Sequence, residues 1–99
     1  MVKQIIWSEK AETSKNEILE YWFLRIGNKR YPKKLYQKFQ LAIKQLVTHP
    51  YIGRKASGFE NVYFIVMGDY KIFYSLQGDS IEILYIWDVR RDPDKLSLK

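Results

Sequence analysis

The chain has 99 residues, of which 46% are apolar and 16% aromatic, and its formal net charge is +6. This composition excludes a disordered tail and predicts one globular domain over residues 1–99. The absence of cysteine excludes disulfides and thiolate metal sites, and no apolar run approaches the ~20 residues of a membrane-spanning helix. Residues 1–7 lack the apolar segment of a signal peptide, so we expect a cytoplasmic protein with no membrane partner.

The first third of the chain predicts a strand and then a helix. Residues 2–7 are rich in good strand formers. Ser8 is a natural N-cap, and the acidic residues just after it suit the first turn of a helix. Apolar residues then recur at steps of three and four to about Ile26, and Gly27 can end the helix in the left-handed conformation.

A second amphipathic helix is predicted after a short basic linker. Pro32 suits its first turn, where the missing N–H is not needed, and Thr48-His49-Pro50 stops it after Val47. Its apolar stripe consists of Leu35, Phe39, Ala42, Ile43 and Leu46. Two such helices with a short link predict an antiparallel helical hairpin that covers a sheet.

The rest of the chain predicts a loop and three strands. Residues 51–61 form the loop, with Arg54-Lys55 at an exposed tip. The strands cover residues 62–67, 70–76 and 80–88. Gly68-Asp69 and Gly78-Asp79 separate them and suit type II′-like hairpin turns, since glycine accepts a positive φ. We therefore expect an α+β fold in the order β-α-α-β-β-β, with an antiparallel sheet covered on one face by the hairpin.

Strict alternation along these strands predicts two unlike sheet faces. Tyr70, Ile72, Tyr74 and Leu76 would share one face with Ile81, Ile83, Tyr85 and Trp87. The other face would mix apolar residues with Lys71, Ser75, Glu82 and Asp88. A mixed face is typical of a sheet side that meets solvent or a ligand.

The positive charge favours an acidic partner, either nucleic acid or an acidic protein, although solubility alone would also account for it. The candidate contact residues are Arg54, Lys55, Lys71, Arg90 and Arg91. Arg90 and Arg91 either contact a target or phosphate or pair with neighbouring aspartates, and Arg54-Lys55 either contacts a target or is a solvated loop. The tryptophans and tyrosines are interpreted as packing residues, with base stacking as the alternative.

The sequence contains no complete set of catalytic residues for RNA cleavage. Cleavage of RNA through the 2′-hydroxyl needs a base and a group that stabilises the phosphorane charge. Lys71 and Arg91 can supply the charge. His49 is interpreted as a helix-end residue, and Glu82 or Asp88 as a cross-strand partner of Lys71, with a catalytic role as the alternative. No metal or cofactor site is indicated.

The chain resembles the RelE/ParE superfamily of bacterial type II toxins from residue 2 to residue 96. The resemblance rests on the β-α-α-β-β-β order, the strand Tyr70-Lys-Ile-Phe-Tyr74, the closing Trp87-Asp-Val-Arg-Arg-Asp-Pro93, and His49-Pro50 followed by Gly53-Arg54. It implies a growth-inhibiting toxin neutralised by a cognate antitoxin with which it forms a hetero-oligomer.

The family contains members that cleave mRNA on the ribosome and ParE-like members that poison DNA gyrase. The RNase members place a basic residue where Lys71 stands and another where Arg90 or Arg91 stands. They also tend to carry basic residues on the preceding strand and a Tyr or His near the C-terminus, which residues 62–67 and 92–99 lack. The resemblance therefore favours a ParE-like toxin over a ribosome-dependent endoribonuclease. A non-toxic nucleic-acid-binding domain is a third alternative.

Overall fold

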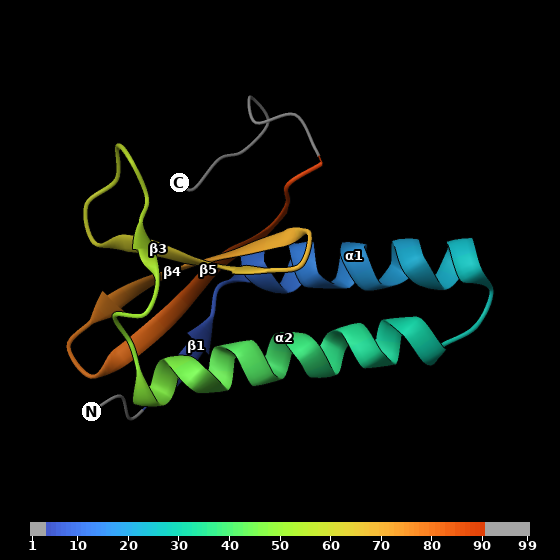
Figure 1. Ribbon diagram of the computed structural model, residues 1–99, viewed down its shortest axis with the longest axis horizontal. Helices are drawn as coiled ribbons and strands as arrows, with labels where there is room; N and C mark the ends of the chain where they lie inside the picture. The colour runs from blue at the N-terminus through green and yellow to red at the C-terminus, as the bar shows by residue number, and fades with distance from the viewer. Residues whose placement is uncertain (1–3, 91–99) are drawn as a thin grey trace.

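The computed structural model describes residues 4–90 and shows two helices packed on one face of a five-stranded sheet (Figure 1). The elements, in chain order, are β1 (Gln4–Trp7), α1 (Glu9–Ile26), α2 (Arg30–Thr48), β2 (Arg54–Lys55), β3 (Val62–Met67), β4 (Tyr70–Gln77) and β5 (Ser80–Asp88). The strand order in the sheet is β1-β5-β4-β3-β2. The predicted fold class is confirmed.

Helix α1 begins and ends where the sequence predicts. The Ser8 side chain accepts a hydrogen bond from the Ala11 N–H at 3.0 Å, which satisfies a donor that the first turn leaves unpaired. Gly27 has φ 84°, and its N–H donates to the Phe23 carbonyl, so the helix closes with a left-handed C-cap.

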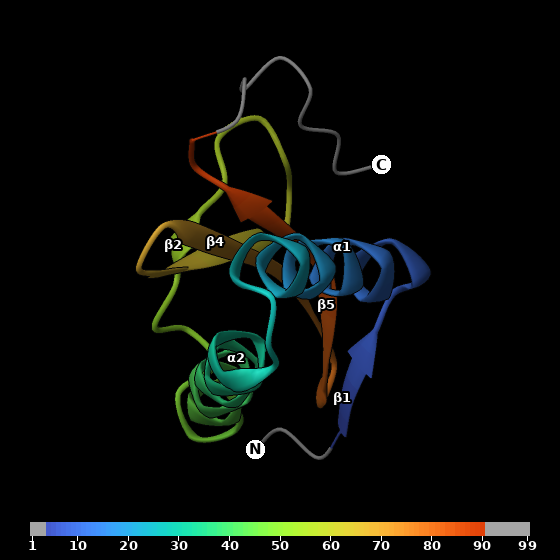
Figure 2. The ribbon, with the colours of Figure 1, turned by 90° about the vertical axis from the view of Figure 1, so that its right-hand side faces the viewer.

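Helix α2 runs back beside α1 to complete the hairpin (Figures 1 and 2). It starts at Arg30, slightly earlier than predicted, so that Pro32 still lies in the first turn. The Trp22 indole N–H donates to the Tyr70 hydroxyl at 2.8 Å, and its ring packs edge-on against Tyr31. These contacts hold the hairpin to the sheet and hold its two helices together near the turn that joins them. Within residues 4–90, no helix is long and apolar enough to cross a membrane.

The predicted meander is confirmed, and the sheet differs from expectation at both edges. β3, β4 and β5 pair antiparallel through tight turns at Gly68 and Gly78, each with φ 60°. β1 pairs parallel with β5, so the sheet is mixed and not wholly antiparallel. Parallel neighbours need a long connection between them, and the chain between β1 and β5 provides one because it includes both helices. Arg54 and Lys55, expected in a loop, form the short strand β2 against Phe64 and Tyr63.

The core lies between the hairpin and the sheet. The residues buried there are Ala11, Ile18, Leu35, Phe39, Ile43, Leu46, Tyr70, Ile72, Tyr74, Ile81, Ile83 and Ile86. The predicted α2 stripe points into this core, apart from Ala42, which is only partly buried. Burial of these side chains is the main source of stability.

A β-bulge overturns the predicted alternation along β5. Tyr74 pairs with Ile83 and Phe73 with Tyr85, so Leu84 is an extra residue without a partner on β4. The extra residue shifts the alternation by one. Ile86 consequently enters the helix-side core, whereas Tyr85 and Trp87 turn to the outer face, contrary to the prediction.

Two serines of the α1 region hold this bulge. Ser8 Oγ donates to the Leu84 carbonyl at 3.0 Å, and the Ile86 N–H donates to Ser14 Oγ at 3.1 Å. Backbone groups that the bulge removes from the strand ladder are therefore paired by side chains.

Candidate functional site

The outer face of the sheet carries a second, smaller apolar cluster. Its buried members are Ala56, Phe73 and Trp87, with Val62, Phe64, Leu84 and Tyr85 packed around them. The bulge supplies Tyr85 and Trp87, and the segment after β2 supplies Ala56. The face is therefore more apolar than the predicted mixed surface.

Lys71 and Arg54 meet at this cluster through Phe64. The Lys71 Nζ lies 4.8 Å from the centroid of the Phe64 ring, a cation–π contact. Arg54 is the register partner of Phe64 on the neighbouring strand and is exposed. The sheet thus brings together two of the predicted contact residues that are 17 positions apart in the sequence.

Tyr74 fixes the segment that leads into Arg54. Its hydroxyl donates to the Pro50 carbonyl at 2.9 Å and accepts from the Gly53 N–H at 3.1 Å. Burial is the main cause that raises the pKa of Tyr74 above the ordinary value for tyrosine. A Cβ on Gly53 would lie 2.5 Å from the same hydroxyl, so only glycine fits this close approach.

Arg90 lies apart from this pair and is engaged within the protein. Its guanidinium donates to both carboxylate oxygens of Asp88, at 2.9 and 2.7 Å, and its carbon lies 5.6 Å from the centroid of the Trp22 ring. The hydrogen bond to Asp88 raises the pKa of Arg90, so the side chain stays cationic. Of the two predicted alternatives, Arg90 shows the pairing with aspartate. Arg91 lies outside the described residues.

The remaining catalytic candidates do not gather around Lys71. His49 is exposed at the end of α2, where its backbone N–H donates to the Gln45 carbonyl. Glu82 lies opposite Ser75, and Asp88 opposite Tyr70, whereas Lys71 lies opposite Trp87. The predicted cross-strand pair between Lys71 and a β5 carboxylate is therefore wrong, because the register separates the charges. Within residues 4–90, no cluster of histidine and acidic residues is suited to a metal ion.

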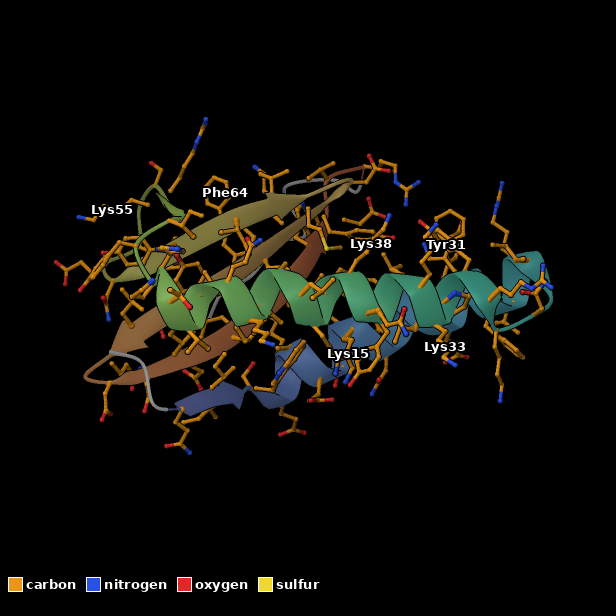
Figure 3. All side chains as sticks on the ribbon, turned by 60° about the horizontal axis from the view of Figure 1, so that its bottom comes forward. Lys15, Tyr31, Lys33, Lys38, Lys55 and Phe64 are labelled. Atoms are coloured by element: carbon orange, nitrogen blue, oxygen red, sulfur yellow. The ribbon has the colours of Figure 1, made fainter. Side chains whose placement is uncertain are left out.

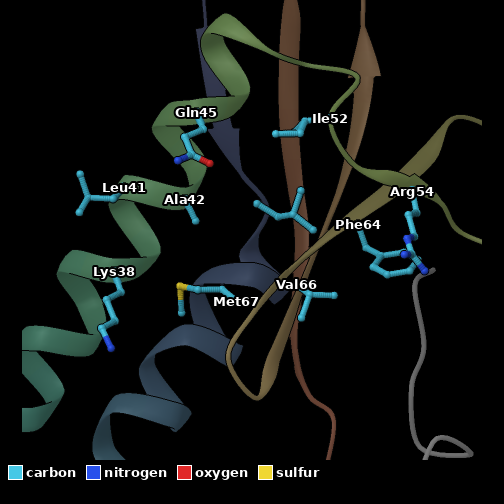
Figure 4. A pocket seen from close by; sticks show the side chains of 10 residues that line it. Lys38, Leu41, Ala42, Gln45, Ile52, Arg54, Phe64, Val66 and Met67 are labelled. Carbon is cyan, nitrogen blue, oxygen red and sulfur yellow. The ribbon is translucent and has the colours of Figure 1, made fainter.

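A groove of about 630 Å³ runs between α2 and the edge of β3 (Figure 4). Its walls are Lys38, Leu41, Ala42 and Gln45 on one side, and Ile52, Arg54 and residues 64–67 on the other. β2 pairs only with Tyr63 and Phe64, so within the described chain no strand covers the outer edge of residues 65–67. The groove therefore combines apolar side chains with backbone groups available to another strand.

The sequence predicted the cations of this region but not the groove. Leu41 is 64% exposed and Val66 is 63% exposed, although both belong to otherwise well-patterned elements. Exposed apolar side chains that line one concavity indicate an interaction surface. The feature of the sequence that could have indicated the groove is Leu41, an apolar residue outside the apolar stripe of α2.

Comparison with known proteins decides the family. A family model described as "ParE toxin of type II toxin-antitoxin system, parDE" matches residues 5–93. The chain belongs to the ParE toxin family. A solved structure titled "Chromosomal ParDE TA system from P. aeruginosa" has the same fold: its TM-score is 0.76 at 22% identity, over 90% of this chain and 97% of that chain. A comparison with curated proteins finds no match.

This ParE toxin is thus a component of a type II toxin–antitoxin system, as the resemblance of its sequence implied. The structure adds two adjoining surfaces, which share Arg54 and Phe64. One is the outer sheet face, where Lys71 and Arg54 flank Phe64. The other is the groove between α2 and β3, which Arg54 also lines.

Proposed function

We propose that this ParE toxin acts in the cytoplasm by binding an essential protein target, DNA gyrase in the first place, without cleaving RNA. The observation that supports this most directly is the environment of Lys71. Its ammonium group lies over Phe64, and the register places the carboxylates of Glu82 and Asp88 opposite other residues. Family membership supports the toxin part of the proposal.

The chemistry of RNA cleavage explains why the Lys71 environment matters. A base must lie within hydrogen-bond reach of the 2′-hydroxyl that attacks. Arginine stays protonated at neutral pH and cannot fill this role. His49, the only histidine of the chain, is at the C-terminus of α2. The cations of the outer face can attract and hold an acidic target, which requires no proton transfer.

We also propose that an antitoxin neutralises the toxin by docking in the groove between α2 and β3. An added strand can hydrogen-bond to the open edge of residues 65–67, while alternate side chains enter the groove. Lys38 and Arg54 at its walls suit acidic residues on the antitoxin. The expected antitoxin is a small acidic protein encoded by the neighbouring gene.

The test of the mechanism compares two assays on the same protein. Primer extension on mRNA from cells that express the toxin should show no ribosome-phased cuts, and purified toxin should inhibit supercoiling by gyrase. Lys71→Ala and Arg91→Ala should weaken growth inhibition. Lys71→Ala should change the melting temperature little, since it removes a charge and not a core side chain. Lys29→Ala, an exposed position between the helices, is the control and should stay toxic. Ribosome-phased cuts with unaffected gyrase would refute the proposal and favour the endoribonuclease.

A further inference from the structure

The helical hairpin extends beyond the sheet, and the last turns of α1 in this extension are apolar (Figure 1). Five of the six residues from Tyr21 to Ile26 are apolar. Only Trp22 among these six is partly buried, and Tyr21, Phe23, Leu24 and Ile26 are 48%, 39%, 70% and 43% exposed. We call residues 21–26 the α1 end. Exposed apolar side chains gathered in this way indicate an interaction site.

Contacts at its base hold the α1 end in a fixed position. The Trp22 indole N–H donates to the Tyr70 hydroxyl at 2.8 Å, and the Trp22 ring packs edge-on against Tyr31, with 5.0 Å between the ring centroids. Figure 3 shows Tyr31 and Lys33 near the end of α2 that extends past the strands. Gly27 then closes α1 with its left-handed C-cap. A partner therefore binds a structure that is already ordered, and little entropy is lost on binding.

The exposed side chains surround α1 and do not form a single stripe. Successive residues of an α-helix point about 100° apart, so Leu24 and Ile26 point to nearly opposite sides. A helix that is apolar on all sides is normally buried on all sides. Within residues 4–90, the α1 end is covered only on the side of Trp22. A concave partner that receives the α1 end can cover the other sides, whereas a flat surface would cover only one.

Positive charge flanks the α1 end. No acidic residue lies between Tyr21 and Lys34, whereas Arg25 lies in the α1 end and Arg30 and Lys33 lie in the first turn of α2. This first turn has no acidic residue and no side-chain cap, although a helix N-terminus favours negative charge. Helix stability therefore does not account for these cations. They favour a partner with acidic residues around the site that receives the α1 end.

The arrangement of charge and apolar surface favours a protein over a lipid or nucleic-acid partner. The turn of residues 27–29 lies beyond Leu24 at the extreme end of the hairpin, and it contains Asn28 and a charged side chain. A bilayer that covered the α1 end would have to bury this charge, which is costly. Duplex DNA would pair with the cations through its phosphates and leave the apolar side chains uncovered. A protein cavity with apolar walls and an acidic rim matches both features.

We infer that the α1 end inserts into a cavity of the toxin's target protein, whose apolar walls surround Leu24 and Ile26 and whose acidic rim faces Arg25 and Arg30. This inference rests on the proposed action on a protein target. It goes further, because it adds an apolar contact at the end of the hairpin to the cations of the outer sheet face. Leu24, the most exposed of the apolar side chains, is the expected centre of this contact.

The first experiment measures the amount of toxin that halves the growth rate of cells without an antitoxin. Leu24→Gln and Ile26→Gln should each raise this amount by about tenfold or more, because an amide would replace an apolar side chain in an apolar cavity. Leu24→Gln should melt like the wild type, since the site is 70% exposed and glutamine forms helices about as well as leucine.

Ile6→Gln is the matched control for Ile26→Gln. The two isoleucines are 41% and 43% exposed, but Ile6 lies on β1, away from the hairpin end. Ile6→Gln should stay within about threefold of the wild type. If Leu24→Gln and Ile26→Gln inhibit growth as strongly as Ile6→Gln does, the inference is wrong.

The second experiment repeats the comparison with purified DNA gyrase in a supercoiling assay. Leu24→Gln should again require about tenfold more toxin, and Arg30→Glu should weaken inhibition more at low than at high salt because it meets an acidic rim. An unchanged Arg30→Glu would overturn the acidic rim. If the wild type inhibits growth but not gyrase, the gyrase target is refuted, and the growth comparison still decides the inference. A wild-type chain that does not inhibit growth would overturn both.

Two other occupants of the α1 end give distinct results. If the toxin alone is a dimer that Leu24→Gln converts to a monomer, the α1 end is an interface between two copies, and the inference is wrong. It is also wrong if the wild type, but not Leu24→Gln, binds vesicles of phosphatidylglycerol. Sedimentation of the free toxin and co-sedimentation with such vesicles provide these tests.

Discussion

Ser14 provides a direct test of how the bulge in β5 is stabilised. Its hydroxyl accepts from the Ile86 N–H at 3.1 Å and donates to the Ala11 carbonyl at 2.9 Å, and the residue is 4% exposed. Ser14→Ala leaves a buried N–H without its partner, which costs about 1–3 kcal/mol. The gain in helix propensity offsets roughly 0.5 kcal/mol. We therefore expect a net loss of about 1–2 kcal/mol in the free energy of unfolding.

For a domain of this size, such a loss lowers the melting temperature by about 5–15 °C. Thermal melts followed by circular dichroism should measure it, and amide exchange should show faster exchange at Ile86. Thr13→Ala, at an exposed position of the same helix, is the matched control and should change stability little. If Ser14→Ala is as stable as Thr13→Ala and Ile86 stays protected, the hydrogen bond to the bulge does not carry the stability assigned to it.

Further predictions concern the loop before β2 and the end of β5. Gly53→Ala should lower the unfolding free energy by about 1–3 kcal/mol, because the new Cβ would lie 2.5 Å from the Tyr74 hydroxyl; unchanged urea denaturation would contradict this contact. Burial raises the pKa of Tyr74 in the folded state above its value in the unfolded chain, about 10. The neutral hydroxyl therefore contributes its full stabilisation below about pH 10, and this stabilisation is lost as the pH rises through the pKa of the folded state. In melts from pH 8 to 11, the stability of Tyr74→Phe should therefore fall less steeply with pH than that of the wild type. The variant should also be less stable at pH 8, because it lacks the hydrogen bonds of the hydroxyl. An unchanged dependence of stability on pH would contradict the raised pKa of Tyr74. Arg90→Ala should cost no more than about 1 kcal/mol in a salt-dependent manner, because the Arg90 side chain is 47% exposed, and a larger, salt-independent loss would disagree with that exposure.

The candidate site was predictable only in part. Cations at positions 54 and 71 could be singled out in the sequence, but their common contact with Phe64 arises from the pairing of β2 with β3 and β3 with β4. The expected partner of Lys71 was wrong for the same reason. Cross-strand neighbours depend on register, and register is set by turns and bulges along the whole sheet.

Local interactions made the helices and turns of this protein readable from its sequence. Ser8 and Gly27 at the ends of α1, and the positive φ of Gly68 and Gly78, depend on the residues themselves and their immediate neighbours. The parallel pairing of β1, the bulge at Leu84 and the groove between α2 and β3 depend on contacts between distant segments. The Ile86 N–H, for example, has Ser14 as its partner, 72 positions away. No local pattern encodes such a pair, because both groups acquire their positions only when the hairpin packs on the sheet.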